Sequence, residues 1–149
     1  MAATTDPTRR KVVMALASVP LLAAGQSALS DEVAPGDSKV LVAYFSRSGN
    51  TKVVAGLLQR AQRADVFEIR PANAYPEGYL ETVEQGRLER DSCFEPALAA
   101  HVPNIANYDL VFLGFPIWGE TAPPVIRSFL STHDLAGKVL VPFITHGGY

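Results

Sequence analysis

The sequence has almost none of the residues that build disulfide frameworks and metal centres. Cys93 is the only cysteine among 149 residues, so an internal disulfide is excluded and stability must come from packing. No metal-like cluster accompanies Cys93, which is interpreted as a free thiol, and no metal site is predicted. Internal repeats and low-complexity tracts are absent too. With 48% hydrophobic residues, the chain is predicted to form one globular domain.

An excess of positive charge is missing as well. The chain has 13 basic and 15 acidic residues, which give a net charge of -2 at pH 7. Domains that bind nucleic acid carry a marked basic excess, so no nucleic-acid partner is predicted.

No apolar run near the N-terminus is long enough to span a bilayer comfortably. The most apolar stretch covers residues 12–24 and contains a serine and a proline, so no stable membrane span is predicted. Arg9, Arg10 and Lys11 precede this run and small residues follow it, which is the order of a secretory signal. Residues 1–28 are therefore predicted to be a cleaved signal peptide, with a buried or disordered N-terminal helix as the alternative.

The export route and the cleavage site are predicted from the same segment. The Arg9-Arg10 pair resembles the twin-arginine signal, which exports folded proteins, and the general secretory route is the alternative. Small residues permit cleavage after Gly25 or Ser27. Removing residues 1–25 leaves 10 of the 13 basic and 14 of the 15 acidic residues, a net charge near -4. The mature protein is expected in the periplasm, with polar residues 29–38 as a linker before the domain.

From residue 39 onward, strand patterns alternate with helix patterns. Continuous apolar runs are typical of strands buried on both faces, and regular apolar spacing of three or four predicts helices. Such alternation predicts an α/β fold with a doubly wound parallel sheet. The helix predicted at 50–63 is expected to bury Val53, Val54, Leu57, Leu58 and Ala61. The expected strands are 39–45, 65–70, 108–115 and 138–145, and the expected helices are 50–63, 78–91 and 123–131.

Ligands of doubly wound sheets bind beyond the carboxyl ends of the strands, so the loops there are the candidate sites. The first loop can wrap a phosphate, because it offers three hydroxyls, a glycine that permits close approach and the free amides of a helix start. It has neither the Gly-x-Gly-x-x-Gly nor the Walker pattern. The alternative is a capped helix start, with Ser48 or Asn50 as the N-cap. The loop consists of Ser46, Arg47, Ser48, Gly49, Asn50 and Thr51.

The loops after the third and fourth predicted strands complete the candidate site. The only tryptophan, Trp118, stands beside Gly119 at the mouth of the third strand, which suits a flat ring, although it could instead pack beneath its loop. Paired glycines after the fourth strand let backbone amides reach a ligand edge. The candidate residues are Pro116, Ile117, Trp118 and Gly119 in one loop and Thr145, His146, Gly147, Gly148 and Tyr149 in the other.

The first loop resembles the flavodoxin family, whose phosphate loop has the form Ser/Thr-x-Ser/Thr-Gly-Asn-Thr. Residues 71–79 and 116–119, with Glu89, are similar to one subfamily of it. The resemblance implies a flavodoxin-like fold over residues 39–149 and FMN as the cofactor. It implies that Ser46 to Thr51 hold the phosphate, with Arg47 at a variable position where solvent is favoured over a phosphate contact.

The resemblance also implies how the flavin ring is held. Trp118 would stack on the ring, the Gly119 carbonyl would meet N5 of the reduced flavin, and the amides of Gly147 and Gly148 would face N1 and O2. Flavodoxins continue beyond the third loop with a helix, a strand and a closing helix. The domain is therefore expected to be incomplete, without the last strand and closing helices, and to expose a sheet edge at residues 138–145.

The predicted function is electron transfer through bound FMN, without a catalytic side chain, to a redox partner protein or a small-molecule acceptor. Within that class, an NAD(P)H-dependent quinone reductase is the alternative. A flavodoxin-fold binding or scaffold protein without flavin is the alternative from another class. The oligomeric state is left open.

Overall fold

The computed structural model of the chain describes residues 39–146. The predicted signal peptide at 1–28 and the predicted linker at 29–38 lie outside the described residues. Gly147, Gly148 and Tyr149 of the third loop lie outside them as well.

Four parallel strands form one sheet, in the order β2-β1-β3-β4. Val42 of β1 pairs with Val66 of β2 on one side and with Phe112 of β3 on the other. The strand order reverses between β1 and β3, which is the switch point of a doubly wound sheet. The predicted α/β fold with a doubly wound parallel sheet is thus confirmed. The strands are β1 Val40–Tyr44, β2 Asp65–Glu68, β3 Leu110–Pro116 and β4 Val139–Thr145.

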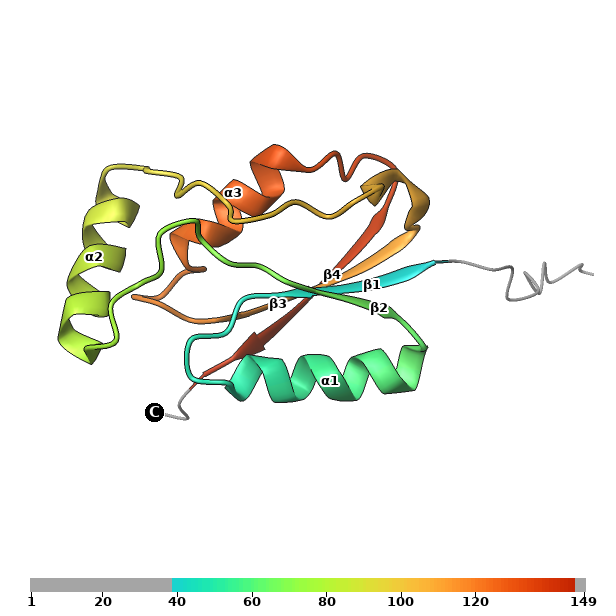
Figure 1. Ribbon diagram of the computed structural model, residues 1–149, viewed down its shortest axis with the longest axis horizontal. Coiled ribbons are helices and arrows are strands. Elements are labelled where there is room, and N and C mark those ends of the chain that lie inside the picture. The colour runs from blue at the N-terminus through green and yellow to red at the C-terminus, as the bar shows by residue number, and fades with distance from the viewer. Residues whose placement is uncertain (1–38, 147–149) are drawn as a thin grey trace, which may run out of the picture. The chain divides into compact units, whose positions relative to one another are not determined.

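Helices cover both faces of the sheet, and one helix lies beyond its end. Figure 1 shows α1 (Asn50–Gln62) along one face and α3 (Pro124–Thr132) across the other. In the same view α2 (Tyr79–Asp91) lies past the carboxyl ends of the strands. A short 3-10 helix, η2 (Ile105–Asn107), precedes β3. No helix among residues 39–146 is long and apolar enough to cross a bilayer.

The face that carries α3 holds the larger core. Alternate residues of β1 and β3 point into it, as the two-residue period of a strand requires. Phe129 of α3 is fully buried there. The buried members are Leu41, Ala43, Phe45, Ile69, Val102, Val111, Leu113, Val125, Ile126 and Phe129.

The face that carries α1 is packed more lightly, and the expected helix face is only partly correct, because Val54 and Leu58 are partly buried but the other expected residues are exposed. Val53 and Leu57 are 66% and 55% exposed, whereas Thr51 and Ala55 are the buried residues of α1. The side of α1 that faces the sheet is therefore not its most apolar side. It carries the smaller side chains of Thr51 and Ala55, which permit close approach to the sheet. The buried core on this face consists of Val42, Tyr44, Ala55 and Ala64.

The expected exposed sheet edge is present among the described residues. β4 pairs with β3 on one side only, and most of its side chains are exposed. Val139 is 61% exposed and Ile144 is 50% exposed, on opposite faces of the strand. Apolar residues of β4 are thus open to solvent.

Candidate functional site

A cavity of about 510 Å³ lies at the carboxyl ends of the strands. Its walls come from the loops after β1, β3 and β4 and from one face of α2. This size and position are typical of a small-molecule site in a doubly wound fold. The cavity is lined by Arg47, Ser48, Asn50, Tyr79, Thr82, Val83, Gly86, Arg87, Arg90, Pro116, Ile117, Trp118, Gly119, Thr145 and His146.

The first loop turns into α1 through a left-handed residue. Gly49 is the N-cap of α1 and has φ of 92°, and no side chain caps the helix. The expectation of Ser48 or Asn50 as N-cap is therefore wrong, because the sharp turn needs a positive φ that glycine adopts without strain. The Ser46 hydroxyl instead accepts a bond from the Gly49 amide at 3.1 Å. The loop is thus closed on itself, with Ser48 and Asn50 left to line the cavity.

Thr51 lies behind the cavity and joins two of its walls. Its side chain is buried, and its hydroxyl is 2.8 Å from the Thr145 hydroxyl at the end of β4. Ser46, Gly49 and Thr51 are not lining residues of the cavity. The structure therefore brings the first and third predicted loops together, with Thr51 acting as a tie between them.

Arg47 is exposed but held in place by the segment that begins α2. Its Nε donates to the Thr82 hydroxyl at 3.2 Å, and one of its terminal nitrogens donates to the Glu77 carbonyl at 2.6 Å. The Arg47 side chain was expected to point freely into solvent. It is instead held in one position at the cavity wall.

The loop after β3 folds into a tight turn at the cavity. Trp118 and Thr121 form an antiparallel bridge, with the Trp118 amide donating to the Thr121 carbonyl at 2.8 Å. The two central residues, Gly119 and Glu120, have φ of 56° and 68°, as in a type I′ turn. The Ile117 amide donates to the Thr145 carbonyl at 3.2 Å, which links this loop to β4.

The Trp118 indole both lines the cavity and packs against the domain. It meets the rings of Phe45 and Tyr75 edge to face, with centroids 5.4 and 4.8 Å apart. A Cβ added at Gly86 would lie 3.1 Å from the indole, so α2 approaches it closely because residue 86 has no side chain. Trp118 therefore does both of the things that the sequence left open: it lines the cavity, and it packs against neighbouring aromatic rings.

A buried carboxylate supports this aromatic cluster. Glu89 is 8% exposed and accepts bonds from the Tyr75 hydroxyl and the Gln85 amide, each at 2.8 Å. Burial, followed by the bond to Glu89, raises the pKa of Tyr75 well above its usual range. Tyr75 therefore remains a hydroxyl donor, and its ring is held at a fixed angle to Trp118.

The wall formed by α2 was missed by the sequence analysis. Its contributing residues recur at intervals of three and four, which places them on one helical face. This interval was present in the sequence, but the face carries no apolar stripe that would mark it as packed or ligand-facing. The residues are Tyr79, Thr82, Val83, Gly86, Arg87 and Arg90.

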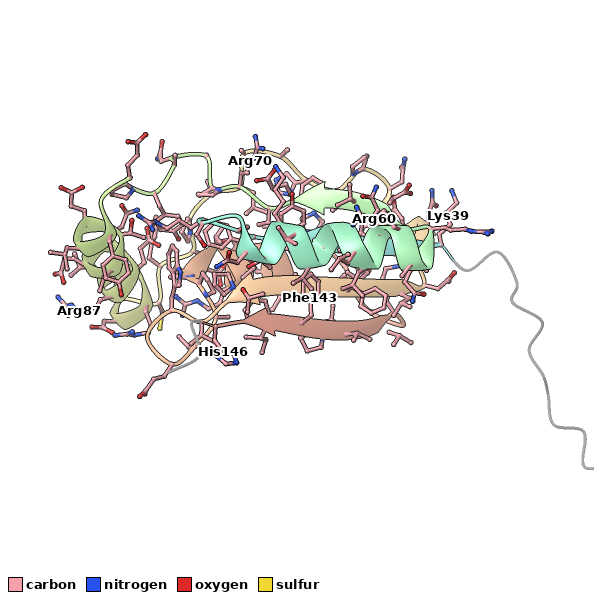
Figure 2. The ribbon with its side chains drawn as sticks, turned by 90° about the horizontal axis from the view of Figure 1, so that it is seen from below. Lys39, Arg60, Arg70, Arg87, Phe143 and His146 are labelled. Carbon is pink, nitrogen blue, oxygen red and sulfur yellow. The ribbon has the colours of Figure 1, made fainter. Side chains whose placement is uncertain are left out.

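The two arginines on the α2 wall, Arg87 and Arg90, are both paired with carboxylates. Arg87 binds Glu84 at 2.7 Å and Asp91 at 3.0 Å, and Arg90 binds Asp91 at 3.0 Å. Arg90 also donates to the Gly119 carbonyl at 3.4 Å, the group that the resemblance assigns to N5 of a flavin. Figure 2 shows Arg87 and His146 toward the same end of the described domain.

No group of three or more potential metal ligands occurs among residues 39–146. Cys93 is an exposed free thiol at a turn with φ of 54°, as expected for the single cysteine. The site therefore offers hydroxyl, amide, guanidinium and aromatic groups to a ligand.

The flavodoxin family model matches residues 39–149 of the chain. The chain therefore belongs to the flavodoxin family, and the expected resemblance is confirmed. The search of curated proteins found no match.

Solved structures support the same assignment. A candidate flavoprotein from Bacteroides eggerthii is 38% identical, with a TM-score of 0.70 over 76% of this chain and 74% of that one. A candidate flavoprotein from Bacteroides uniformis is 36% identical, with a TM-score of 0.69 over 75% and 74% of the two chains. A flavoprotein from Lactobacillus acidophilus, solved in complex with FMN, is 22% identical, with a TM-score of 0.67 over 75% and 77%. The last similarity concerns the fold alone.

Proposed function

We propose that this protein binds FMN in the cavity and transfers electrons through it. The observation that carries the proposal is that the loops after β1, β3 and β4 line one cavity at the switch point of the sheet. Family membership and the relative solved with FMN support the choice of cofactor.

The residues of the cavity fit the two parts of FMN. Arg47, Ser48 and Asn50 offer a cation, a hydroxyl and an amide beside the start of α1, where free backbone amides favour a phosphate. A Cβ at Gly49 would meet no side chain of the described residues outside its own chain neighbours within 4 Å, so the loop leaves room there. Ile117 and Trp118 offer apolar surface for the ring.

In this proposal FMN supplies the redox chemistry and the chain's own residues bind and orient it. The first loop holds the phosphate, and Trp118, fixed by Phe45 and Tyr75, sets the plane against which the ring lies. Gly119 lines the cavity at the turn after β3, and its carbonyl accepts a bond from Arg90 at 3.4 Å. No side chain is assigned a catalytic role.

The decisive experiment is to purify the full-length protein and examine its absorption. We expect a yellow protein that releases FMN on denaturation, and an apoprotein that regains the flavin spectrum when FMN is added. A colourless protein that ignores added FMN would contradict the proposal and favour a scaffold without flavin.

The role of Trp118 is tested in the same preparation. Trp118→Ala is expected to shift the flavin potentials and to restore fluorescence that stacking quenches. Trp118→Phe, which keeps an aromatic face, is the matched control and is expected to preserve most of the quenching. Unchanged fluorescence and potentials in Trp118→Ala would place the ring elsewhere.

A quinone reductase is the second candidate. Tyr79, Val83 and Ile117 are 67%, 49% and 45% exposed and all line the cavity. Exposed apolar side chains at a cavity suit a flat apolar acceptor better than the charged surface of a protein partner. NADPH oxidation coupled to quinone reduction would support this candidate, and its absence in FMN-loaded protein would favour an electron shuttle.

We further propose export of the FMN-loaded protein through the twin-arginine route. The site is assembled from loops far apart in sequence, so it exists only after folding, and this route carries folded proteins. Replacing Arg9 and Arg10 with lysine is expected to leave an FMN-loaded precursor in the cytoplasm. Undiminished export in cell fractions would remove this proposal without affecting FMN binding.

A further inference from the structure

Arg47 differs from the other cavity arginines in its charge balance. Its two bonds go to the Thr82 hydroxyl and the Glu77 carbonyl, which are both neutral acceptors. Among residues 39–146, no carboxylate lies within salt-bridge distance of Arg47, whereas Arg87 and Arg90 are each paired with one. The positive charge of Arg47 is therefore not offset by a neighbouring acidic group of the described domain.

The position of Arg47 is fixed by a buried polar group. Thr82 is 3% exposed, and its hydroxyl shares its one hydrogen between the Pro76 and Gly78 carbonyls, at 2.7 and 2.9 Å, while it accepts the bond from Arg47. A hydroxyl held by two carbonyls cannot easily follow a moving side chain. The guanidinium is thus preorganised, which lowers the entropic cost of binding a ligand.

Arg47 lines the cavity and has donors that its two hydrogen bonds do not use. A guanidinium has five N–H groups, and only Nε and one terminal nitrogen are used as donors. Arg47 adjoins Ser48 and lies near Asn50, which line the same end of the cavity. A hydrogen bond from a charged donor to an anion is stronger than one to a neutral acceptor. A guanidinium beside neutral donors therefore favours an anion over a neutral group of the same size.

We infer that Arg47 is the specificity-determining residue of the phosphate subsite, selecting a doubly charged phosphate monoester over a neutral or singly charged group. The inference rests on the proposed FMN function. It assigns to this subsite a preference for FMN over riboflavin, which has no phosphate, and over FAD, whose phosphates each carry one charge. The charge comes from the side chain at position 47, in addition to the backbone amides of the loop.

The test is a fluorescence titration of full-length apoprotein with FMN, FAD and riboflavin. Arg47→Gln is expected to weaken FMN binding by about tenfold to a hundredfold, the usual effect of losing a charged hydrogen bond. Riboflavin binding is expected to stay unchanged. Arg47→Lys, which keeps the charge without the planar fork, is expected to lie between. Arg60→Gln removes an exposed charge elsewhere on α1 and is the matched control, with unchanged binding expected.

The outcomes separate the inference from the proposed function. Equal losses for FMN and riboflavin, or no loss of FMN affinity, in Arg47→Gln would overturn the inference while FMN binding stands. An equal loss in Arg60→Gln would also overturn it, since the effect would then be one of net charge. A wild-type protein that binds none of the three flavins would overturn the FMN proposal and this inference together. Far-UV circular dichroism of each variant checks that exposed position 47 leaves the fold intact.

Discussion

Beneath α3 the sheet is sealed by large apolar side chains, whereas the face that carries α1 is covered over only part of its width. The α3 core holds ten buried residues and the α1 core holds four. Substitutions of large side chains beneath α3 should therefore cost more global stability than comparable substitutions on the face that carries α1. The candidate site spans both faces, because Trp118 packs against the α3 core whereas the first loop and the end of β4 adjoin the lightly packed face.

The largest expected effect is at Phe129, which is fully buried beneath α3. Phe129→Ala leaves a cavity against Phe67 and His133, whose rings it contacts. We expect a loss of about 3–5 kcal/mol in the free energy of unfolding. Phe143→Ala, a partly buried phenylalanine on the other face, is the matched control and should cost less than half as much. Equal losses in urea denaturation would remove the distinction between the faces.

The next effect is at Gly114, where the lightly packed face has its tightest contact. A Cβ at this position would overlap the ring of Phe143, so Gly114→Ala is expected to destabilise by about 1–3 kcal/mol. Because Phe143 lies on the edge strand, its removal should relieve the clash. The double variant Gly114→Ala/Phe143→Ala should therefore lose less than the sum of the two single variants. Additive losses would show that the backbone of β3, not the ring, is responsible.

The strands and their carboxyl-end loops were predictable from sequence because the signals are local. Continuous apolar runs mark β1, β3 and β4, and parallel alternation forces their loops to one edge. The helix start at Gly49 was predicted only in part. The side-chain cap predicted at Ser48 or Asn50 was wrong because Gly49 takes the cap position with a positive φ.

The remaining features could not be predicted because they depend on packing between distant segments. The sequence shows that α2 is a helix rich in Glu and Arg, but not that its Gly86 face lies against Trp118. The tie between Thr51 and Thr145 joins residues 94 positions apart. Val53 and Leu57 form a regular apolar stripe that predicts burial, yet the sheet is met by smaller residues of the same helix.

Lowering the pH is expected to have a smaller effect on the free energy of unfolding, through His133 in the α3 core. Its Nδ1 donates to the Phe129 carbonyl and its Nε2 accepts from the Val102 amide, each at 2.9 Å. This arrangement requires a neutral ring, and burial lowers the pKa of His133 below 6.5. Protonation would break the bond from Val102. The contribution to stability is therefore complete above pH 6.5 and is lost as the pH falls through the folded-state pKa.

The measurement for His133 is the free energy of unfolding between pH 7.5 and pH 5.5. The wild type should lose at most about 1.4 kcal/mol per pH unit from this group. His133→Gln should be less stable at pH 7.5 but should lose less on acidification. His101→Gln removes a neighbouring exposed ring whose charge also lowers the pKa of His133, so it should reduce the slope by less than His133→Gln does. A wild-type slope in His133→Gln would assign the pH dependence to other groups.

The smallest change in the free energy of unfolding is expected for a substitution at Leu57. This substitution tests directly whether the face that carries α1 is open to solvent. Leu57 is 55% exposed on α1, and glutamine is nearly as good a helix former as leucine. If solvent covers this position, Leu57→Gln should change the free energy of unfolding by no more than about 0.5 kcal/mol. Leu58→Gln, one residue along and packed against the smaller core, is the matched control and should cost several times more. A loss above about 1.5 kcal/mol at Leu57 would mean that this stripe is buried in the protein in solution. The periodicity that predicted its burial would then have been correct, and the contrast between the two faces would be smaller than the described residues indicate.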